Sequence, residues 1–531
     1  MRTKPWSATS SSNSWYHLQD VGSHPPTLAR QDAPFTGQDR SERRGEASFL
    51  PYVEPLNEAR TKLAGFFNIL QVTLPDYACP PYNAGPMTTT RASLHTLGCR
   101  LNQAETSILG EGLRRKGFEL VEFGQPTDVL ILNTCSVTED AERTSRYLIR
   151  KTLKHSPHAF IAVTGCYAQT GMESLTQQSG IDLIVGQQFK MDLPAYLPPP
   201  HELRKRPAAE VHHTKTISRA DFELPYFAEP GSTRALLKIQ DGCSAMCSFC
   251  IIPFARGHER SRKLDDILSE VRSLTTGGYK EIVLTGVNIG QYKQQGVDFC
   301  TMLRRLDQIT DLERIRISSI EPTTVTDELL DLLASSKKFC PYLHIPLQSG
   351  DDEILQAMNR RHTIKKYRAL IDRAFAKIPD LGLGTDLMAG FPGETEMAFQ
   401  NTLAIAADLP FSYLHVFSYS ARPGTAATRL KQRVPSALVK KRTELLLELD
   451  RTKRLAFHNK QIGKTVSVLF EAGTRGAHRF GTTPNFTRVA VTDAGDLQNQ
   501  IMPVTITAAT DRHGFGHIAS AQAMPSAMAL L

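Results

Sequence analysis

Residues 243–250 read Cys243-Ser244-Ala245-Met246-Cys247-Ser248-Phe249-Cys250. The three cysteines stand at offsets of four and three, and an aromatic residue directly precedes the last of them. Cysteine thiolates hold the irons of iron–sulfur clusters, so three thiolates on one tight loop can hold three irons of a four-iron cubane. The fourth iron then lacks a protein ligand. The stretch therefore predicts a cluster that can bind a small molecule at its open iron.

Zinc is the main alternative for this loop. Structural zinc takes four ligands, usually two cysteine pairs or a cysteine pair with a histidine pair. No second pair follows the loop, because the next cysteine is Cys300. Three unrelated buried cysteines would require a coincidence within eight residues. We therefore favour the cluster, and we interpret Cys300 and Cys340 as structural because neither has a partner at ligand spacing.

Upstream of the loop, residues 90–200 alternate between strand-like and helix-like patterns, which indicates an α/β domain with a parallel sheet. Three apolar runs each end directly before a cysteine, and these runs are 93–98 before Cys99, 129–134 before Cys135 and 160–165 before Cys166. Carboxyl ends of parallel strands meet at one edge of a sheet, where ligands bind. The three cysteines can therefore form a second three-thiolate set. Alternatively, they are small core residues, since free cysteine is often buried.

Downstream, residues 231–455 show six further βα repeats, which predict a partial (βα)6 barrel with its site at the carboxyl ends of the strands. The expected strands are 235–239, 281–285, 314–318, 342–346, 381–387 and 413–417. Polar residues at these ends are Thr285, Asn288, Ser318, Ser319, Glu321, Gln348, Asp386 and Glu394. Each could instead be a turn or cap residue.

Residues 460–525 carry short alternating runs at 465–470, 487–491 and 502–506, which favour a small antiparallel β-barrel of the kind that grips RNA. Basic and aromatic residues interleave there at Arg479-Phe480 and at Phe486-Thr487-Arg488, and we expect Arg479, Phe486 and Arg488 to contact RNA. Phosphates would contact the arginines, and unstacked bases could lie on the two phenylalanine rings. Alternatively, both phenylalanines belong to the core of the barrel.

The composition of the chain indicates which kind of partner it binds and in which cellular compartment it works. The 531-residue chain has a formal net charge of +8, with seven Lys or Arg and no acid in 421–442. Such a basic excess favours a polyanionic partner, although a solvated basic face is an equal alternative. We expect no membrane span and no export signal, so the nine cysteines indicate a reducing cytoplasm. Residues 1–86 are predicted to be a disordered or mis-annotated extension before Met87, and 201–230 a linker.

The blocks together resemble the methylthiotransferases of the radical S-adenosylmethionine (SAM) superfamily, over roughly residues 90 to 525. The motifs behind this resemblance are Thr96-Leu97-Gly98-Cys99-Arg100-Leu101-Asn102, Asn133-Thr134-Cys135, Thr164-Gly165-Cys166-Tyr167, the 243–250 loop, His344-Ile345-Pro346-Leu347-Gln348-Ser349-Gly350 and Gly390-Phe391-Pro392-Gly393-Glu394-Thr395. The segment 481–489 is similar to the terminal RNA-binding barrel of that family, called TRAM.

The resemblance implies two 4Fe–4S clusters. Cys243, Cys247 and Cys250 would hold the one that binds and cleaves SAM, and Cys99, Cys135 and Cys166 an auxiliary one that carries the transferred sulfur. Residues expected to contact SAM are Thr285, Asn288, Ser319, Glu321, Gln348 and Asp386. A flavodoxin or ferredoxin would supply electrons, and a further donor would supply sulfur.

The implied substrate is the anticodon loop of tRNA. The string Gly98-Cys99-Arg100-x-Asn102 resembles enzymes that act at C2 of N6-threonylcarbamoyladenosine at position 37. Alternatives with the same chemistry are isopentenyladenosine in tRNA and an aspartate of a ribosomal protein. An alternative of another class is a non-catalytic iron–sulfur protein that binds RNA.

Overall fold

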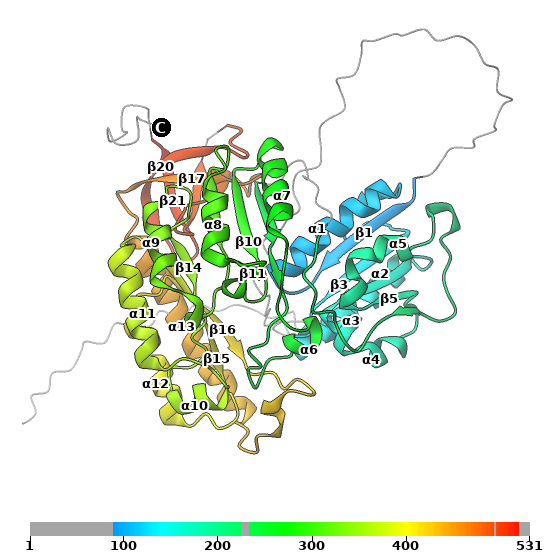
Figure 1. Ribbon diagram of the computed structural model, residues 1–531, viewed down its shortest axis with the longest axis horizontal. Helices are drawn as coiled ribbons and strands as arrows, with labels where there is room; N and C mark the ends of the chain where they lie inside the picture. Colours follow the sequence, from blue (N-terminus) through cyan, green and yellow to red (C-terminus); the bar gives the residue numbers. More distant parts are fainter. Residues whose placement is uncertain (1–88, 225–232, 493–494, 520–531) are drawn as a thin grey trace, which may run out of the picture. The chain divides into compact units, whose positions relative to one another are not determined.

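The computed structural model describes residues 89–224, 233–492 and 495–519. The expected extension 1–86 and the proposed start at Met87 lie outside the described residues. The described chain forms two α/β regions followed by a β-barrel (Figure 1). This arrangement confirms the fold class predicted from the sequence.

The first region is a six-stranded parallel sheet in the order β2-β1-β3-β4-β5-β6. Its strands are β1 (Arg91–Thr96), β2 (Glu119–Val121), β3 (Val129–Thr134), β4 (Phe160–Gly165), β5 (Leu183–Val185) and β6 (Glu210–His212). The central strands β3 and β4 are buried along their whole length, as expected when helices cover both faces of a parallel sheet. The edge strand β6 lies within the range 201–230 that we expected to be a linker.

Helices on opposite faces complete this region. They are α1 (Arg100–Arg115), α2 (Glu139–His155), α3 (Cys166–Thr170), α4 (Met172–Thr176) and α5 (Leu193–Tyr196). Val129 and Ile131 of β3 pack with Leu109 of α1, whereas Leu130 of the same strand packs with Leu148 of α2. Successive side chains of a strand point to opposite faces, so one strand supports both helices.

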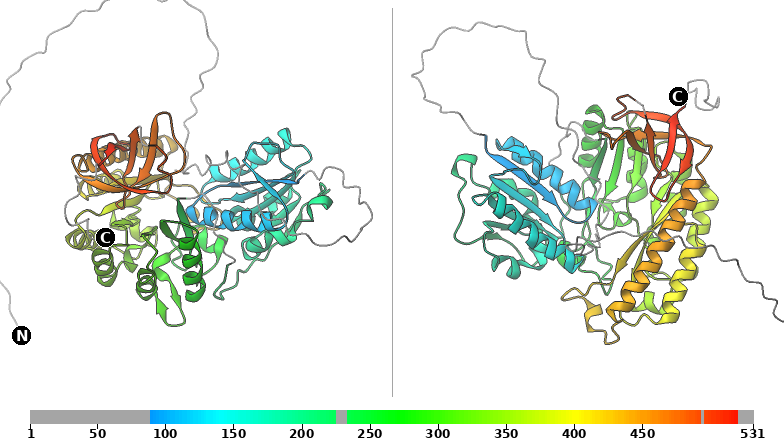
Figure 2. Two further views of the ribbon diagram at one scale, coloured as in Figure 1. Left: turned by 90° about the horizontal axis from the view of Figure 1, so that it is seen from above. Right: turned by 180° about the vertical axis from the view of Figure 1, so that it is seen from behind.

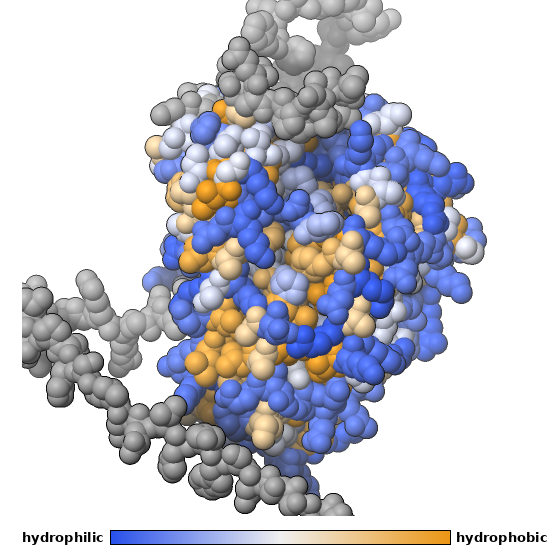
Figure 3. Space-filling view, turned by 90° about the vertical axis from the view of Figure 1, so that its left-hand side faces the viewer, coloured by the Kyte–Doolittle hydropathy of each residue, from blue (hydrophilic) through white to orange (hydrophobic). Residues whose placement is uncertain are grey.

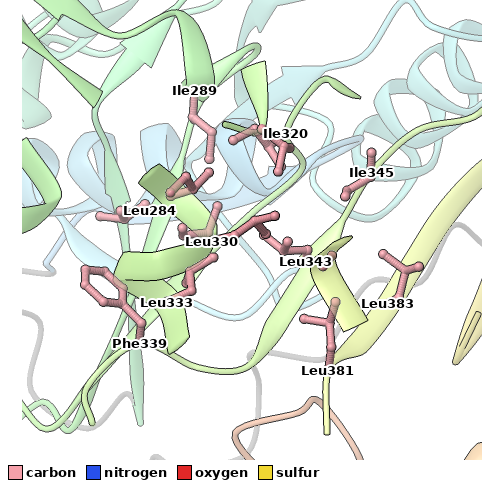
Figure 4. Close-up of a cluster of buried hydrophobic side chains, with 14 of the residues drawn as sticks. Leu284, Ile289, Ile320, Leu330, Leu333, Phe339, Leu343, Ile345, Leu381 and Leu383 are labelled. Atoms are coloured by element: carbon pink, nitrogen blue, oxygen red, sulfur yellow. The ribbon is translucent and has the colours of Figure 1, made fainter. Parts of the chain in front are cut away.

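The second region contains two parallel three-stranded sheets, β13-β10-β7 and β14-β15-β16. Its main strands are β7 (Arg234–Lys238), β10 (Glu281–Thr285), β13 (Arg314–Ile317), β14 (Tyr342–His344), β15 (Gly382–Ala389) and β16 (Tyr413–Ser418). A parallel bridge between Ser319 and His344 joins the two sheets. All six expected strands are therefore present in a partial barrel, whose buried core is drawn in Figure 4.

Helices follow the strands of this barrel. They are α6 (Ile252–Arg256), α7 (Leu264–Thr276), α8 (Phe299–Asp307), α9 (Asp327–Ser335), α10 (Asp352–Ala357), α11 (Ile364–Lys377), α12 (Glu396–Asp408) and α13 (Ser436–Asn459). The short elements of this region are β8 (Gln240–Asp241), β9 (Arg260–Ser261), β11 (Lys293–Gln294), β12 (Val297–Asp298) and the 3-10 helices η3 (Ile289–Gln291), η4 (Pro322–Thr324) and η5 (Ala426–Arg429). Two further 3-10 helices, η1 (Gln187–Asp192) and η2 (Pro200–Glu202), belong to the first region. Thr326, Thr363 and Thr395 accept a backbone hydrogen bond at the starts of α9, α11 and α12, which satisfies a donor that each helix leaves unpaired.

The long helix α13 packs against β16 and leads to the C-terminal barrel (Figure 2). That barrel closes in the order β17-β18-β19-β21-β20. Its strands are β17 (Thr465–Phe470), β18 (His478–Thr482), β19 (Arg488–Thr492), β20 (Ile501–Ala509) and β21 (Gly514–Ile518). The expectation of an antiparallel barrel is wrong for one pair, because β19 and β21 run parallel. Closing five strands, an odd number, requires at least one such pair.

Hydrophilic side chains surround smaller hydrophobic areas on the face of the molecule in Figure 3. Among the described residues, none of the helices combines the length and the apolar character needed to cross a bilayer.

Candidate cluster and SAM site

The loop 243–250 begins just after β8 and is held by backbone hydrogen bonds at both ends. The amide of Cys243 donates to the Gly257 carbonyl at 3.0 Å, and the amide of Ser248 donates to the Met358 carbonyl at 3.0 Å. Met246 adopts φ of 51° at the exposed tip. A left-handed backbone conformation is uncommon outside glycine, and here it lies between Cys243 and Cys247.

Burial raises the pKa of the Cys243 thiol and raises the pKa of the Cys250 thiol to about 12. Both thiols are therefore protonated near neutral pH in the apo chain. Cysteine binds metal as a thiolate, so metal binding to this loop must release protons. All three cysteines are free of disulfides.

A cavity of about 170 Å³ lies beside the loop. Cys243, Cys247, Asn288, Glu321 and Arg360 line it, together with His362. Arg360 forms a two-armed ion pair with Glu321 at 3.1 and 2.6 Å and approaches the Cys247 sulfur at 3.5 Å. The cavity thus holds a charged pair directly against a predicted cluster ligand.

Three residues that line this cavity have a buried polar atom without a hydrogen-bond partner. These atoms are Oδ1 of Asn288, Nε of Arg360 and Nε2 of His362. Buried polar groups are normally paired, so each of these atoms calls for a ligand or water. Burial and the neighbouring Arg360 lower the pKa of His362 to about 4, which keeps its ring neutral. An acceptor, a fixed cation and a neutral imidazole suit a zwitterion with ammonium and carboxylate groups, such as the methionine part of SAM.

Two of the six predicted SAM residues, Asn288 and Glu321, line the cavity, whereas Thr285, Ser319, Gln348 and Asp386 do not. The Thr285 hydroxyl donates to the Val283 carbonyl at 3.1 Å. Asp386 lies between His344 at 3.0 Å and His415 at 3.1 Å. Burial alone would raise the Asp386 pKa, but the two imidazoles hold it below its ordinary value. Arg360 and His362 were missed from the sequence, because they lie more than 100 residues beyond the loop and carry no local motif.

The other predicted trio follows three adjacent strands. Cys99 comes three residues after the end of β1, and Cys135 and Cys166 directly follow β3 and β4. Gly98 permits close approach here, because a Cβ at that position would lie 2.8 Å from the Cys135 sulfur. Burial, followed by the charges of Cys166 and Cys99, raises the pKa of Cys135 to about 12. The three thiols thus share the carboxyl edge of one sheet.

Neither trio is arranged like a site for a single ion. Within the described ranges, no group of three His, Cys, Asp or Glu side chains could hold one metal ion. Ligands of one Zn²⁺ must converge on a single point, whereas the thiolates of a cluster each bind a different iron.

Apo protein should show the buried state of Cys135 directly. Because its pKa is about 12, its thiolate fraction at pH 8 is roughly 10³-fold below that of a free thiol with a pKa near 8.5. We expect iodoacetamide to label Cys135 about 10³-fold more slowly than in urea-unfolded chain, and about tenfold faster per pH unit up to pH 11, as read by peptide mass spectrometry. A fast, pH-independent reaction at pH 7–9 would contradict this burial.

The three predicted RNA contacts have different surroundings. The half-buried Phe486 ring packs on Tyr342 at 4.7 Å between centroids, and Arg100 and Arg316 lie over it. Arg488 lies 4.6 Å from the Phe480 ring centroid, and Arg479 lies 3.4 Å from Asp496.

The C-terminal barrel carries an aromatic group of which only Phe480 was singled out from the sequence. This group consists of His478, Phe480, His513 and Phe515, which lie on or beside β18 and β21. All four are partly exposed, and Arg488 covers one of the rings. We refer to these four residues as the aromatic group.

Two family models match the chain. The Radical SAM superfamily matches residues 237–406, which include the 243–250 loop, and Uncharacterized protein family UPF0004 matches 91–186, which include the strand-end cysteines. The first match defines the barrel and its loop as those of a radical-SAM enzyme.

Similar proteins of known name show to which family of radical-SAM enzymes the chain belongs. Threonylcarbamoyladenosine tRNA methylthiotransferase MtaB of Aquifex aeolicus is 38% identical, over 71% of this chain and 92% of its own length. The protein of the same name in Bacillus subtilis is 35% identical, over 78% and 93%. A tRNA-2-methylthio-N(6)-dimethylallyladenosine synthase of Cereibacter sphaeroides (strain ATCC 17025) is 35% identical, over 78% and 95%. The chain therefore belongs to the radical-SAM methylthiotransferase family, an enzyme family that uses SAM and a 4Fe–4S cluster, which confirms the resemblance.

Proposed function

We propose that the enzyme installs a methylthio group at C2 of N6-threonylcarbamoyladenosine at position 37 of tRNA. The observation that carries the chemistry is the pair of free cysteine trios, one on the barrel loop and one at the carboxyl edge of the N-terminal sheet. The substrate is supported by the two relatives named for threonylcarbamoyladenosine and by the Gly98-Cys99-Arg100 string.

The cysteines divide the work between two clusters in this proposal. Cys243, Cys247 and Cys250 hold the cluster that binds SAM, and Cys99, Cys135 and Cys166 hold an auxiliary cluster. When bound, these groups supply the reductive cleavage of SAM and the sulfur that is transferred. An electron donor such as flavodoxin or ferredoxin and a separate sulfur source are required for turnover.

Cavity residues orient SAM in this proposal. The unpaired Oδ1 of Asn288 accepts from the ammonium group, and the Arg360 guanidinium faces the carboxylate. The Glu321 carboxylate fixes the arginine by its two-armed ion pair. A fixed guanidinium loses less freedom on binding than a mobile one, so the pair lowers the cost of holding SAM in one orientation.

The C-terminal barrel binds the tRNA in this proposal, with the aromatic group stacking on unpaired bases. Replacing Phe480 and Phe515 together by alanine should weaken tRNA binding, because each stacked base is worth about 1–3 kcal/mol, or roughly 5- to 150-fold in Kd. The measurement is a filter-binding titration at one fixed salt concentration. Tyr147→Ala removes a 54% exposed aromatic residue on α2 and serves as the matched control. Equal affinity in the double variant and the control would exclude the aromatic group from RNA binding.

Nucleoside mass spectrometry tests the substrate. tRNA from cells lacking the gene, and with no redundant enzyme, should lack 2-methylthio-N6-threonylcarbamoyladenosine and accumulate the unmethylthiolated nucleoside. A plasmid copy of the wild-type gene should restore it, and a Cys247→Ala copy should not. Undiminished product in the deletion strain would refute the proposal.

A second candidate substrate is isopentenyladenosine in tRNA. It is favoured by the similarity to the dimethylallyladenosine synthase of Cereibacter sphaeroides. In that case the same digest would lose 2-methylthio-N6-dimethylallyladenosine and keep the threonylcarbamoyl product. The two nucleosides differ in mass, so one experiment separates the two substrates.

A further inference from the structure

A buried polar network connects the segments that carry the two cysteine trios. Its charged members are Glu105 of α1, Lys190 of η1, Lys238 of β7, Asp241 of β8 and Arg256 of α6, and each side chain is at most 5% exposed. Two carboxylates thus face three cations in the interior. The partly buried Arg260 also reaches Asp241, at 3.4 Å.

Arg256 is the centre of this network. One guanidinium nitrogen donates to Asn102 Oδ1 at 2.6 Å and to Glu105 at 2.9 Å. The other donates to Glu105 at 3.0 Å and to Asp241 at 2.9 Å. A planar fork with donors in fixed directions can serve three acceptors at once, which a lysine ammonium cannot do in the same geometry.

On the N-terminal side, Asn102 carries the connection to the strand-end cysteines. Its amide nitrogen donates to the Leu97 carbonyl at 2.8 Å and to the Thr134 carbonyl at 3.0 Å. Leu97 lies two residues before Cys99, and Thr134 directly precedes Cys135. One side chain therefore ties two of the three cysteine-bearing turns to Arg256.

On the barrel side, the connection reaches the loop from both ends. Asp241 lies two residues before Cys243, and its carboxylate accepts from the Gly242 amide at 2.8 Å. Arg256 ends α6, which starts two residues after Cys250, and α6 packs against α3, the helix that begins with Cys166. The path Asp241–Arg256–Asn102 thus joins the two trios through three side chains.

The energetics of buried charges indicate that this network fixes the relative positions of its residues. Removing five charged groups from water carries a large desolvation cost, so buried ion pairs add little net stability compared with apolar packing. Their hydrogen bonds are directional, however, and the network offers one arrangement in which every charge has a partner. Such a network fixes relative placement more than it strengthens association.

We propose that Arg256 is a positioning residue that holds the two cysteine trios at the separation required for sulfur transfer. The inference rests on the proposed function, in which both trios carry clusters. A 1 Å error in placing reacting groups can cost about 10²-fold in rate. Loss of the fork should therefore uncouple the two reactions: SAM is still cleaved at the barrel loop, but the sulfur no longer reaches the product.

The test compares Arg256→Gln and Arg256→Lys with wild type and with Arg272→Gln, an exposed arginine on α7. Each protein is reconstituted anaerobically and assayed for 5′-deoxyadenosine, methylthiolated nucleoside, iron content and Tm. We expect both Arg256 variants to keep full iron and 5′-deoxyadenosine formation within about threefold. Their ratio of methylthio product to 5′-deoxyadenosine should fall by about 10- to 100-fold, and the control should match wild type. If the glutamine variant does not fold, the lysine variant, which keeps the buried cation, decides.

A second readout is independent of turnover. Pulsed electron paramagnetic resonance reports the dipolar coupling between the two reduced clusters, and this coupling should change in the Arg256 variants alone. An unchanged product ratio, an unchanged coupling, or a proportional loss of both products would overturn the positioning role. If the wild-type enzyme forms no methylthio product, the proposed function is wrong. If the wild-type enzyme forms it and the Arg256 variants form it equally well, only the positioning role is wrong.

Discussion

Replacing Cys99, Cys135 and Cys166 together by alanine is expected to end methylthio transfer while 5′-deoxyadenosine formation continues. The three side chains follow adjacent strands and none of them lines the cavity beside the 243–250 loop, so we expect their loss to leave that loop and its cysteines in place. Iron content should fall from about eight to about four per chain, since in the proposed function one of two four-iron clusters loses its ligands. Anaerobic reconstitution, iron analysis and chromatography of both products provide the measurement.

The matched control for this variant is Cys300→Ala. Cys300 lies on α8 in the barrel core, is 8% exposed and belongs to neither trio. It should keep both products and all of the iron. Methylthio transfer that persists in the triple variant would remove the role assigned to the first sheet, whatever happens to the iron content.

Cys247→Ala should abolish both products. Cys247 lines the cavity beside the 243–250 loop and its sulfur lies 3.5 Å from Arg360, so in the proposed function this substitution removes a cluster ligand next to the bound SAM. Because sulfur transfer requires cleaved SAM, no methylthiolated nucleoside should form even though the auxiliary cysteines are intact. Iron should again fall to about four per chain.

The complementary iron losses make these two variants informative as a pair. One should lose only the transferred sulfur, and the other should lose both reactions. Measurable 5′-deoxyadenosine from Cys247→Ala would mean that this cysteine is dispensable for SAM cleavage.

Much of the fold followed from local patterns. The cysteines at 99, 135 and 166 were expected to share a sheet edge because each follows an apolar run, and β1, β3 and β4 are indeed neighbours. Parallel strands with helical crossovers leave little freedom in where their carboxyl ends lie. The six barrel strands were predicted for the same reason.

Two strands of the C-terminal barrel were not predicted. β18 and β21 contain three glycines and two histidines in ten residues, which weakens an alternating pattern. The glycines of β18 and β21 are required because the closed barrel brings neighbouring strands close to them. A Cβ at Gly516, for example, would lie 2.7 Å from a Val504 methyl group. Such a requirement arises only when distant strands are brought together, so it has no local signature.

Some site residues could likewise be predicted from local patterns, whereas others could not. The cysteine spacing is local, but the cavity depends on where α10 and α11 end and begin relative to the loop. Arg360 and His362 are placed there by tertiary packing, and so is the Arg256 network. Four of the six polar strand-end residues expected near SAM lie outside the cavity lining. A position at a strand end does not specify which way a side chain points.

The measurement that tests the central claim most directly is the iron content and Mössbauer spectrum of anaerobically reconstituted wild-type protein. Two cysteine trios predict about eight irons per chain, all in four-iron clusters. About four irons per chain in a protein with full methylthio transfer would contradict the account, because the strand-end thiols would then hold no cluster.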